Sequence, residues 1–213
     1  MAFSVSFLDR LSTRLQRPLP GHEAHLRMSP RYEVRQDALS VEDRACREAG
    51  VLALLLPYDD MPSVVLTVRR DDLNDHGGQI SFPGGEREEG ESLRDAALRE
   101  AHEEVDLTPQ SVRLLGGLTP LYIPPSNFCV HPFVGVVDSA PVLRPTDREV
   151  AEILRAPLHH LLDPATRIVE TWTLHGQEVD VPYYDVAGRT VWGATAMMLA
   201  ELLTLVDDAG LPK

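Results

Sequence analysis

Residues 84–107 join a glycine-rich loop to a helix, and they constrain the fold more than any other part of the chain. The stretch opens with two glycines, runs through a mostly charged loop, and reaches Ser92 three residues before Asp95. A serine followed three residues later by an acidic residue resembles a capping box, which sets where a helix begins. The sequence therefore predicts a helix from Ser92 to about Val105.

The apolar side chains of this predicted helix recur every four residues, at Leu93, Ala97, Ala101 and Val105. Because an α-helix turns once every 3.6 residues, this spacing puts them on one face. Small alanines let such a face approach a sheet closely. We therefore expect one α+β domain in which this and other helices flank a mixed β-sheet.

Three glutamates, Glu100, Glu103 and Glu104, lie beside that face at i, i+3 and i+4 and point in the same direction. Like charges at this spacing repel one another, so an isolated helix gains nothing from them. Acidic helix surfaces are usually solvated, and the three residues alone favour that interpretation. The alternative is a hard divalent cation with oxygen ligands, Mg²⁺ or Mn²⁺, which would use their convergence.

The loop before the helix contains partners for such a site. Arg99 could pair with Glu91 and hold the loop against the helix. Gly84 and Gly85 lack a Cβ, so their backbone could approach a metal or a phosphate. Glycine-rich loops are commonly plain turns, but here the loop, the cap, the small-residue face and the clustered acids fall within 24 residues. This combination favours a functional site.

The same residues resemble the Nudix box, Gly-x5-Glu-x7-Arg-Glu-U-x-Glu-Glu-x-Gly-U, where U is aliphatic. Ala101 occupies the first U position. Asp106 stands where the pattern has glycine, and because aspartate tolerates the left-handed conformation, we expect an altered helix end and not an inactive site. The positions that match are Gly85, Glu91, Arg99, Glu100, Glu103, Glu104 and Leu107.

This resemblance implies a Nudix-type α-β-α sandwich and hydrolysis of a nucleoside diphosphate linked to another group. Metal would neutralise the charge that develops on the diphosphate and help to make hydroxide from water. Metal is also needed to admit the substrate, because residues 86–104 contain eight acids and three bases. The residues implied are, for the metal, Gly85, Glu100, Glu103 and Glu104 and, for catalysis, Glu103, Arg99 and Glu91.

The sequence just upstream, residues 66–85, resembles the signature LLTxRSxxLxxHxGQxxFPGG of the coenzyme A pyrophosphatase branch. Arg70 stands where that branch has serine and Asn74 where it commonly has arginine, so Arg70 could take over a contact of the missing arginine. A later segment, residues 122–128, resembles the substrate-side loop of the same branch. The substrate-binding residues that these resemblances imply are Arg69, Arg70, His76, Gln79, Phe82, Pro125 and Ser126.

A general base from outside the box would complete the reaction, as it often does in Nudix enzymes. Glu149 or Glu152 could serve, and we include Glu152 in the predicted site. The competing interpretation is a plain carboxylate on the surface of a helix, which we expect at residues 150–153.

The leading hypothesis is a Mg²⁺- or Mn²⁺-dependent hydrolase that splits coenzyme A and its thioesters into 3′,5′-ADP and 4′-phosphopantetheine or its acyl derivative. A second hypothesis keeps the chemistry and changes the substrate to ADP-ribose, a dinucleotide or an oxidised nucleotide. A third is a non-catalytic Nudix-like module that binds a nucleotide, against which the retained Arg99 and the three glutamates argue. An acidic calcium-binding module would need a DxDxDG loop, which the chain lacks.

The remaining pattern indicates an N-terminal helix and irregular lead-in over residues 1–39, followed by a Nudix hydrolase domain over residues 40–213. Phe7, Leu8, Leu11 and Leu15 have helical spacing and predict a short helix docked on the body. Ser40 could cap another short helix through residues 45–46. Further expected elements are a strand hairpin at 51–56 and 64–68, strands at 79–82, 112–115, 133–137, 168–174 and 178–181, and a helix at 191–206.

Charge and cysteine content limit the partners and the location. The net charge of −13 and the pI near 5.0 argue against nucleic acid or an anionic membrane as the partner. The longest apolar run, residues 51–56, is far shorter than the roughly 20 residues of a membrane span. Cys46 and Cys129 are too few for a disulfide framework or a zinc ribbon and fit a reducing cytosol. We expect a cytoplasmic enzyme with a small-molecule nucleotide substrate and no nucleic-acid or membrane partner, and a homodimer is left open.

Overall fold

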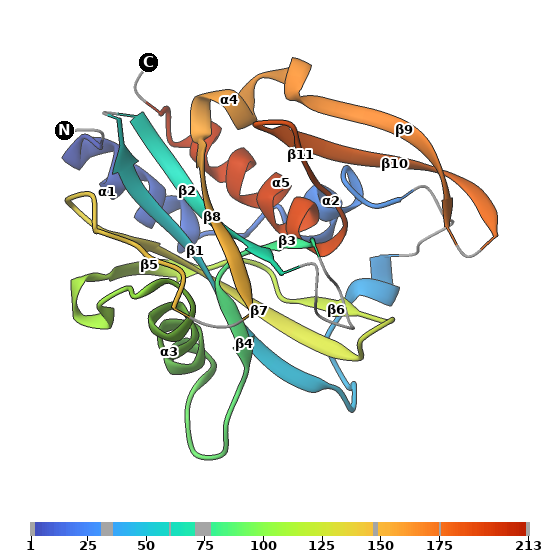
Figure 1. Cartoon of the computed structure of the whole chain (residues 1–213), viewed down its shortest axis with the longest axis horizontal. Coiled ribbons are helices and arrows are strands. Elements are labelled where there is room, and N and C mark those ends of the chain that lie inside the picture. The colour runs from blue at the N-terminus through green and yellow to red at the C-terminus, as the bar shows by residue number, and fades with distance from the viewer. Residues whose placement is uncertain are drawn as a thin grey trace.

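A mixed β-sheet of eight strands forms the centre of the molecule, and helices cover it on both sides (Figure 1). The computed structural model describes residues 3–30, 36–59, 61–70, 78–146, 149–174 and 176–211. The main path of the sheet runs β3-β2-β1-β7-β5, while β4 pairs with β1, β6 with β7 and β8 with β2. The strands are β1 (Arg47–Tyr58), β2 (Met61–Arg69), β3 (Ile80–Ser81), β4 (Gly84–Glu86), β5 (Arg113–Gly117), β6 (Leu121–Ile123), β7 (Phe128–Val136) and β8 (Val150–Pro157).

Strand β1 lies in the middle of the sheet because both of its faces are apolar. Its run of six apolar residues, 51–56, is typical of a strand that is buried on both sides. Successive side chains alternate between the faces, so Val51 and Leu55 enter one hydrophobic core while Leu52 and Leu54 enter the other. The strand pairs in parallel with β7 and forms the expected antiparallel hairpin with β2.

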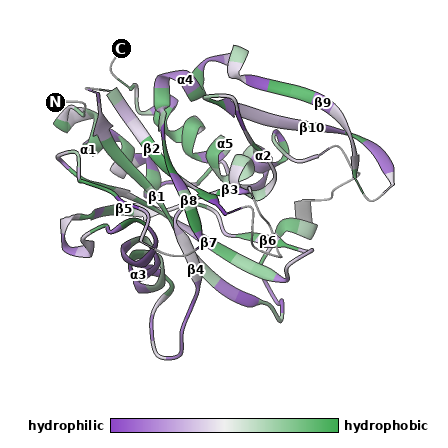
Figure 2. Ribbon diagram, viewed as in Figure 1, coloured by the Kyte–Doolittle hydropathy of each residue, from purple (hydrophilic) through white to green (hydrophobic). Residues whose placement is uncertain are grey.

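The helices make the outer layers of an α-β-α sandwich, which confirms the predicted α+β fold. Helix α3 (Leu93–Val105) packs Ala97 and Ala101 into the core that contains Leu52 and Leu54. Helices α5 (Gly193–Asp208) and α1 (Val5–Leu15) contribute to the opposite core, and α2 (Gly21–Leu26) packs against α5. Figure 2 shows α3 as largely hydrophilic and α5 as largely hydrophobic. No helix among these residues combines the length and the apolarity needed to cross a bilayer.

A smaller antiparallel sheet precedes α5 and lies beside it (Figure 1). Its strand β10 pairs with β9 on one side and β11 on the other. The segment that leads into this sheet contains helix α4 (Leu158–Leu162) and a 3-10 turn at Pro164–Thr166. The three strands are β9 (Arg167–Leu174), β10 (Gln177–Val186) and β11 (Arg189–Val191).

The N-terminal helix docks on the body, as its spacing predicts. Phe7 and Leu11 of α1 are fully buried in the core that α5 shares. Helix α2 and a 3-10 turn at Gln36–Leu39 lie within the stretch that the sequence marks as irregular. The sequence signal for α2 is weak because it is only six residues long and follows two prolines.

Two predicted helices are wrong. Residues 150–153 belong to strand β8, which pairs with the edge of β2, for example through Val64 and Ala156. Four residues are too few for periodicity to separate a helix from a strand, and the sheet edge supplies the backbone hydrogen bonds. Residues 40–46 form a turn with Asp43 at a φ of 57°, and they lead directly into β1.

Cys46 and Cys129 form a disulfide bond, which the sequence analysis did not foresee. Cys46 immediately precedes β1 and Cys129 lies in β7, and the parallel register of these strands places Arg47 opposite Phe128. The two Cα atoms are therefore only 5.8 Å apart despite a sequence separation of 83 residues. Disulfides are rare in the cytosol. The cysteine content therefore no longer supports the expected reducing compartment.

Candidate active site

Helix α3 begins and ends where the sequence predicts, and this places its carboxylates. The Ser92 hydroxyl accepts a hydrogen bond from the Asp95 backbone N–H at 3.2 Å and donates to the Asp95 carboxylate at 2.7 Å. At the other end Asp106 has a φ of 59°, the left-handed conformation that the Nudix pattern assigns to glycine. Its backbone N–H bonds the carbonyl of His102 at 3.0 Å. The helix is therefore capped at both ends. At its C-terminal end, Asp106 takes the place that glycine has in the pattern.

Arg99 connects the helix to the loop that precedes it. Its guanidinium donates to the Glu91 carboxylate at 2.8 Å and to the Glu86 backbone carbonyl at 3.0 Å. The hydrogen bond with Glu91 is the main cause that raises the pKa of Arg99 above its ordinary value and lowers the pKa of Glu91. The same guanidinium also contacts Glu100 at 2.8 Å and Glu103 at 3.2 Å. The expected Arg99–Glu91 pair is present, and Arg99 gathers two of the three clustered glutamates as well.

The third glutamate, Glu104, is buried against the glycine-rich loop. It is 9% exposed, and its carboxylate accepts a hydrogen bond from the Gly84 backbone N–H at 3.2 Å. A Cβ on Gly85 would lie 2.5 Å from the carboxylate carbon of Glu100, so any other residue there would displace that carboxylate. Strand β4, which contains both glycines, pairs with β1. The sheet therefore holds the loop where it contacts two glutamates of α3.

A cavity of about 560 Å³ lies beside these residues. Glu100, Glu104 and Gly85 line it together with Arg69 and Gln79 from the upstream signature. The remaining wall is part charged and part apolar: Arg47, Ala49, Val51, Ser81, Gly84, Glu86, Ile123, Phe128, Val130 and Glu149. The cavity therefore brings predicted metal ligands and predicted substrate contacts together.

The two carboxylates considered for the general base, Glu149 and Glu152, lie in different surroundings. The carboxylate of Glu152 pairs with Arg189 of β11, and Glu152 does not line the cavity. Glu149, the alternative, does line it, and its carboxylate lies 2.7 Å from the Arg69 guanidinium. Glu149 immediately precedes strand β8 and lies at the cavity, whereas Glu152 lies within the strand opposite Val68. Of the two candidates, Glu149 is therefore the one placed at the cavity.

Other predicted substrate contacts lie apart from the cavity wall. Phe82 is 1% exposed and belongs to the core, so it has a packing role. Pro125 and Ser126 form the turn between β6 and β7, whose flanking residues Ile123 and Phe128 line the cavity instead. Arg70 is exposed, and its backbone N–H bonds the Glu149 carbonyl at 2.8 Å. His76, like Asn74, lies outside the described residues.

Two cavity residues were missing from the predicted site. The Arg47 guanidinium lies 4.2 Å from the centre of the Phe128 ring, a cation–π arrangement, and bonds the Glu86 carboxylate at 3.0 Å. Phe128 is the last residue of the segment, residues 122–128, that resembles a substrate-side loop, so the sequence did contain a signal for its place in the cavity. Arg47 has no sequence signal, because only the β1–β7 pairing brings it beside Phe128.

The donor set fits a hard divalent cation. Glu100, Glu103 and Glu104 offer carboxylate oxygens, and the absence of a Cβ at Gly85 leaves its backbone open beside Glu100. In the described part of the chain, no three histidine, cysteine or acidic side chains are already gathered as a metal site. Arg99 accounts for this arrangement, because its guanidinium draws Glu100 and Glu103 toward itself.

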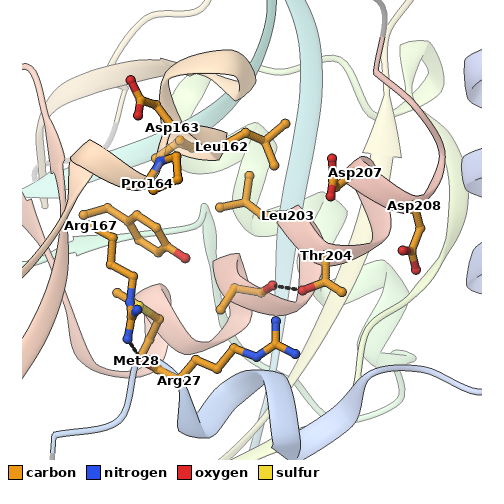
Figure 3. Close-up of a pocket in the computed structure, with 13 residues that line it drawn as sticks. Arg27, Met28, Leu162, Asp163, Pro164, Arg167, Leu203, Thr204, Asp207 and Asp208 are labelled. Carbon is orange, nitrogen blue, oxygen red and sulfur yellow. Dashed lines mark hydrogen bonds between the residues drawn. The ribbon is translucent and has the colours of Figure 1, made fainter.

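A second cavity, of about 330 Å³, lies between α5, α4 and the end of α2, and aspartates and arginines both line it (Figure 3). Met28 and Leu203 are among its apolar wall residues, and Arg27 and Arg167 bring positive charge. Burial raises the pKa of Tyr184, which also lines it, to about 12. No residue of the predicted site lines this cavity.

A capped acidic helix lies beside a cavity on the mixed sheet, and Arg99 joins this helix to the glycine-rich loop. These features are those of a hydrolase. A family model described as the NUDIX domain matches residues 47–172. The chain therefore belongs to the Nudix family. As a Nudix hydrolase it acts on a phosphoric anhydride of a nucleoside diphosphate derivative, and Nudix hydrolases generally use divalent metal ions.

Relatives and solved structures agree with this family. The chain is 34% identical over 169 residues to "Uncharacterized Nudix hydrolase NudL" of Pectobacterium atrosepticum, covering 76% of this chain and 84% of the relative. The protein of the same name from Photorhabdus laumondii is 35% identical over 158 residues, covering 73% and 84%. The Nudix hydrolase RenU of M. smegmatis superposes with a TM-score of 0.51 at 18% identity, covering 82% of this chain and 96% of that one. A MutT/nudix family protein from Enterococcus faecalis gives 0.51 at 16% identity, covering 96% and 76%.

Proposed function

We propose that this Nudix hydrolase cleaves the pyrophosphate bond of coenzyme A and its thioesters. The products are 3′,5′-ADP and 4′-phosphopantetheine or its acyl derivative. The observation that carries the proposal is the shared cavity: Arg69 and Gln79 of the upstream signature line the same cavity as Glu100 and Glu104. These two positions match the coenzyme A pyrophosphatase signature, so their place beside the acidic helix supports this substrate.

The reaction uses charged groups that line the cavity and two, Arg99 and Glu103, that lie beside it on α3. Glu100, Glu103, Glu104 and the Gly85 backbone would hold Mg²⁺ or Mn²⁺, which supplies charge neutralisation for the diphosphate and a more acidic water. Arg99 positions two of these carboxylates from the side of the loop. The Glu149 carboxylate would accept a proton from the attacking water while Arg69 keeps it oriented at 2.7 Å.

The 3′-phosphate of coenzyme A needs a positive partner in this acidic cavity. Arg47 and Arg69 are the cationic residues among the cavity lining that the structure describes. Arg47 is already held by Phe128 and Glu86, so its guanidinium has little freedom to lose on binding an anion. Phe128 beside it offers an aromatic face for the adenine ring.

A substrate panel tests the proposal. The purified chain is incubated with Mg²⁺ or Mn²⁺ and, separately, with coenzyme A, dephospho-coenzyme A, ADP-ribose, a diadenosine polyphosphate and an oxidised nucleotide, and the products are separated chromatographically. Coenzyme A should have the highest kcat/KM and should exceed dephospho-coenzyme A, which lacks the 3′-phosphate. Faster turnover of ADP-ribose than of coenzyme A would contradict the proposal.

A different nucleoside diphosphate substrate is the second candidate. It is favoured by one specific observation, which is that Arg70 and Asn74 depart from the coenzyme A signature. The same panel separates the two candidates. A cytoplasmic location and a homodimer stay predictions, and light scattering of the purified chain would test the second.

A further inference from the structure

A second cleft continues from the active-site cavity on the far side of Gln79. It has a volume of about 500 Å³, and Gln79 lines both it and the active-site cavity. Residues 149–152 also connect the two, because Glu149 lines the cavity while Glu152 pairs with Arg189 of the cleft. The residues that line the cleft are Gly78, Gln79, Ile80, Trp172, Gly188, Arg189, Thr190 and Trp192. A molecule seated in the cavity could therefore extend along Gln79 into the cleft.

Two indole rings form the apolar part of this cleft. The rings of Trp172 and Trp192 are half-buried and meet edge to face, with their centres 5.3 Å apart. Trp172 is held from behind by stacking on Tyr183 at 5.8 Å and by a hydrogen bond from its Nε1 to Glu170 at 3.1 Å. An anchored pair of aromatic rings offers rigid apolar surface at small entropic cost.

The polar groups of the cleft suit an uncharged ligand. Arg189 is its charged residue among those described, and the carboxylate of Glu152 neutralises it. The Gln79 amide and the Thr190 hydroxyl are exposed and can both donate and accept hydrogen bonds. Trp192 also lines the cleft, and its Nε1 has no hydrogen-bond partner among the described residues. Such a surface matches amide groups alternating with apolar carbons and offers little to a phosphate.

We infer that this cleft binds the non-nucleotide arm of the substrate, as a chain that contains secondary amides. The inference rests on the proposed function: in coenzyme A the arm is pantetheine, whose two amides and gem-dimethyl carbon fit the polar groups and the indole faces. The diphosphate lies at Glu100 and Glu104, and the arm leaves it past Gln79. Trp172, Trp192 and Thr190 are then specificity residues that distinguish coenzyme A from ADP-ribose.

Tryptophan fluorescence reads this cleft directly, because Trp172 and Trp192 are the two tryptophans of the chain. The full chain carrying Glu103→Gln, in which hydrolysis is slowed, is titrated in Mg²⁺ with coenzyme A, pantetheine and 3′,5′-ADP. Coenzyme A and pantetheine should shift or quench the emission with saturation, whereas 3′,5′-ADP should leave it nearly unchanged. Equal responses to 3′,5′-ADP and coenzyme A, or no response to either amide-bearing molecule, would overturn the inference.

Steady-state kinetics supply a second test. Trp172→Ala and Trp192→Ala should each raise the KM for coenzyme A roughly tenfold, the effect of losing one aromatic contact, and should leave turnover of ADP-ribose unchanged. Thr173→Ala is the matched control, because Thr173 is exposed and its side chain points to the opposite face of β9 from Trp172. Thermal melts followed by circular dichroism confirm that each variant folds.

The outcomes separate this inference from the proposed function. If coenzyme A is hydrolysed and both tryptophan variants keep the wild-type KM, the cleft does not bind the arm although the proposed function stands. If coenzyme A is not hydrolysed but pantetheine still changes the fluorescence with saturation, the cleft binds amide chains and the proposed reaction fails.

Discussion

Arg99 organises the acidic site at the scale of single residues. One guanidinium contacts Glu91, Glu100 and Glu103 and the backbone of Glu86, so the loop and the helix share one cation. Without it, the carboxylates of one helical turn would repel one another. The residue therefore orders the site before any metal or substrate enters.

Replacing Glu103 should remove activity and leave the fold unchanged. Its side chain is 52% exposed, so Glu103→Gln disturbs little packing, but it removes the charge of one proposed metal ligand. We expect kcat to fall by at least roughly 100-fold, with the same thermal midpoint. Glu89→Gln is the control, because it makes the same change at an exposed acid of the loop that precedes α3. Wild-type turnover in Glu103→Gln would move the catalytic centre elsewhere.

The Glu91–Arg99 pair should stabilise the protein only above acidic pH. The hydrogen bond from Arg99 lowers the pKa of Glu91 in the folded state, so the folded state binds its proton less readily than the unfolded state. The stability that wild type gains over Glu91→Gln is therefore complete above the unfolded pKa of about 4.3 and is lost as pH falls through the lowered folded pKa. Urea unfolding of both proteins between neutral and acidic pH measures this difference. A difference that grows on acidification would show that the pair does not have this role.

At the scale of elements, the β1–β7 pairing carries more than sheet hydrogen bonds. It places Arg47 beside Phe128 in the active-site cavity, and it brings Cys46, the residue before Arg47, to Cys129, the residue after Phe128. The covalent link and the cation–π pair are thus adjacent. The geometry of this cavity wall depends on both strands keeping their register.

Reduction of the disulfide should destabilise the chain measurably. Closing a loop across 83 residues lowers the entropy of the unfolded state by an amount worth up to about 4.5 kcal/mol in the chain-entropy model. A strong reductant should therefore shift urea unfolding of the wild type to lower concentration. The Cys46→Ser/Cys129→Ser double variant should already unfold there and should not respond to reductant. An identical midpoint for the wild type with and without reductant would mean that the bond does not form.

At the scale of the whole molecule, a buried carboxylate ties the N-terminal segment to the body. Glu201 of α5 is fully buried and accepts hydrogen bonds from Gly21 N–H at 2.9 Å, Thr119 N–H at 2.9 Å, the Thr119 hydroxyl at 2.6 Å and His25 at 3.1 Å. Burial alone would raise the pKa of Glu201, but the hydrogen bonds from His25 and Thr119 outweigh it and lower the pKa. The carboxylate of Glu201, in α5, therefore joins that helix both to α2 and to the segment that precedes β6.

Glu201→Ala should destabilise the whole chain. The substitution leaves several buried donors without an acceptor, and breaking such a network costs roughly 3 kcal/mol. We expect a clear fall in the urea midpoint. Glu23→Ala, which removes an exposed acid from α2, should have little effect. Equal midpoints for the two variants would show that the N-terminal segment does not depend on this carboxylate.

Sequence reasoning predicted the site best where its chemistry is local. The cap at Ser92, the Arg99–Glu91 pair and the left-handed Asp106 lie within one loop and one helix, and short-range spacing determines them. It was wrong at residues 150–153, where a sheet edge decided the structure. It chose Glu152 over Glu149 for the same reason, because a strand changes which side chains face the cavity.

The sequence by itself determined the acidic helix, its loop and the two-faced central strand, because spacing along one segment sets which side chains share a face. Only the tertiary structure decided which distant residues meet: Arg47 with Phe128, Cys46 with Cys129, Glu201 with His25, and the tryptophan cleft with Gln79. These contacts arise from strand register and from packing between layers. Neither strand register nor packing between layers produces a periodic pattern in the amino-acid sequence.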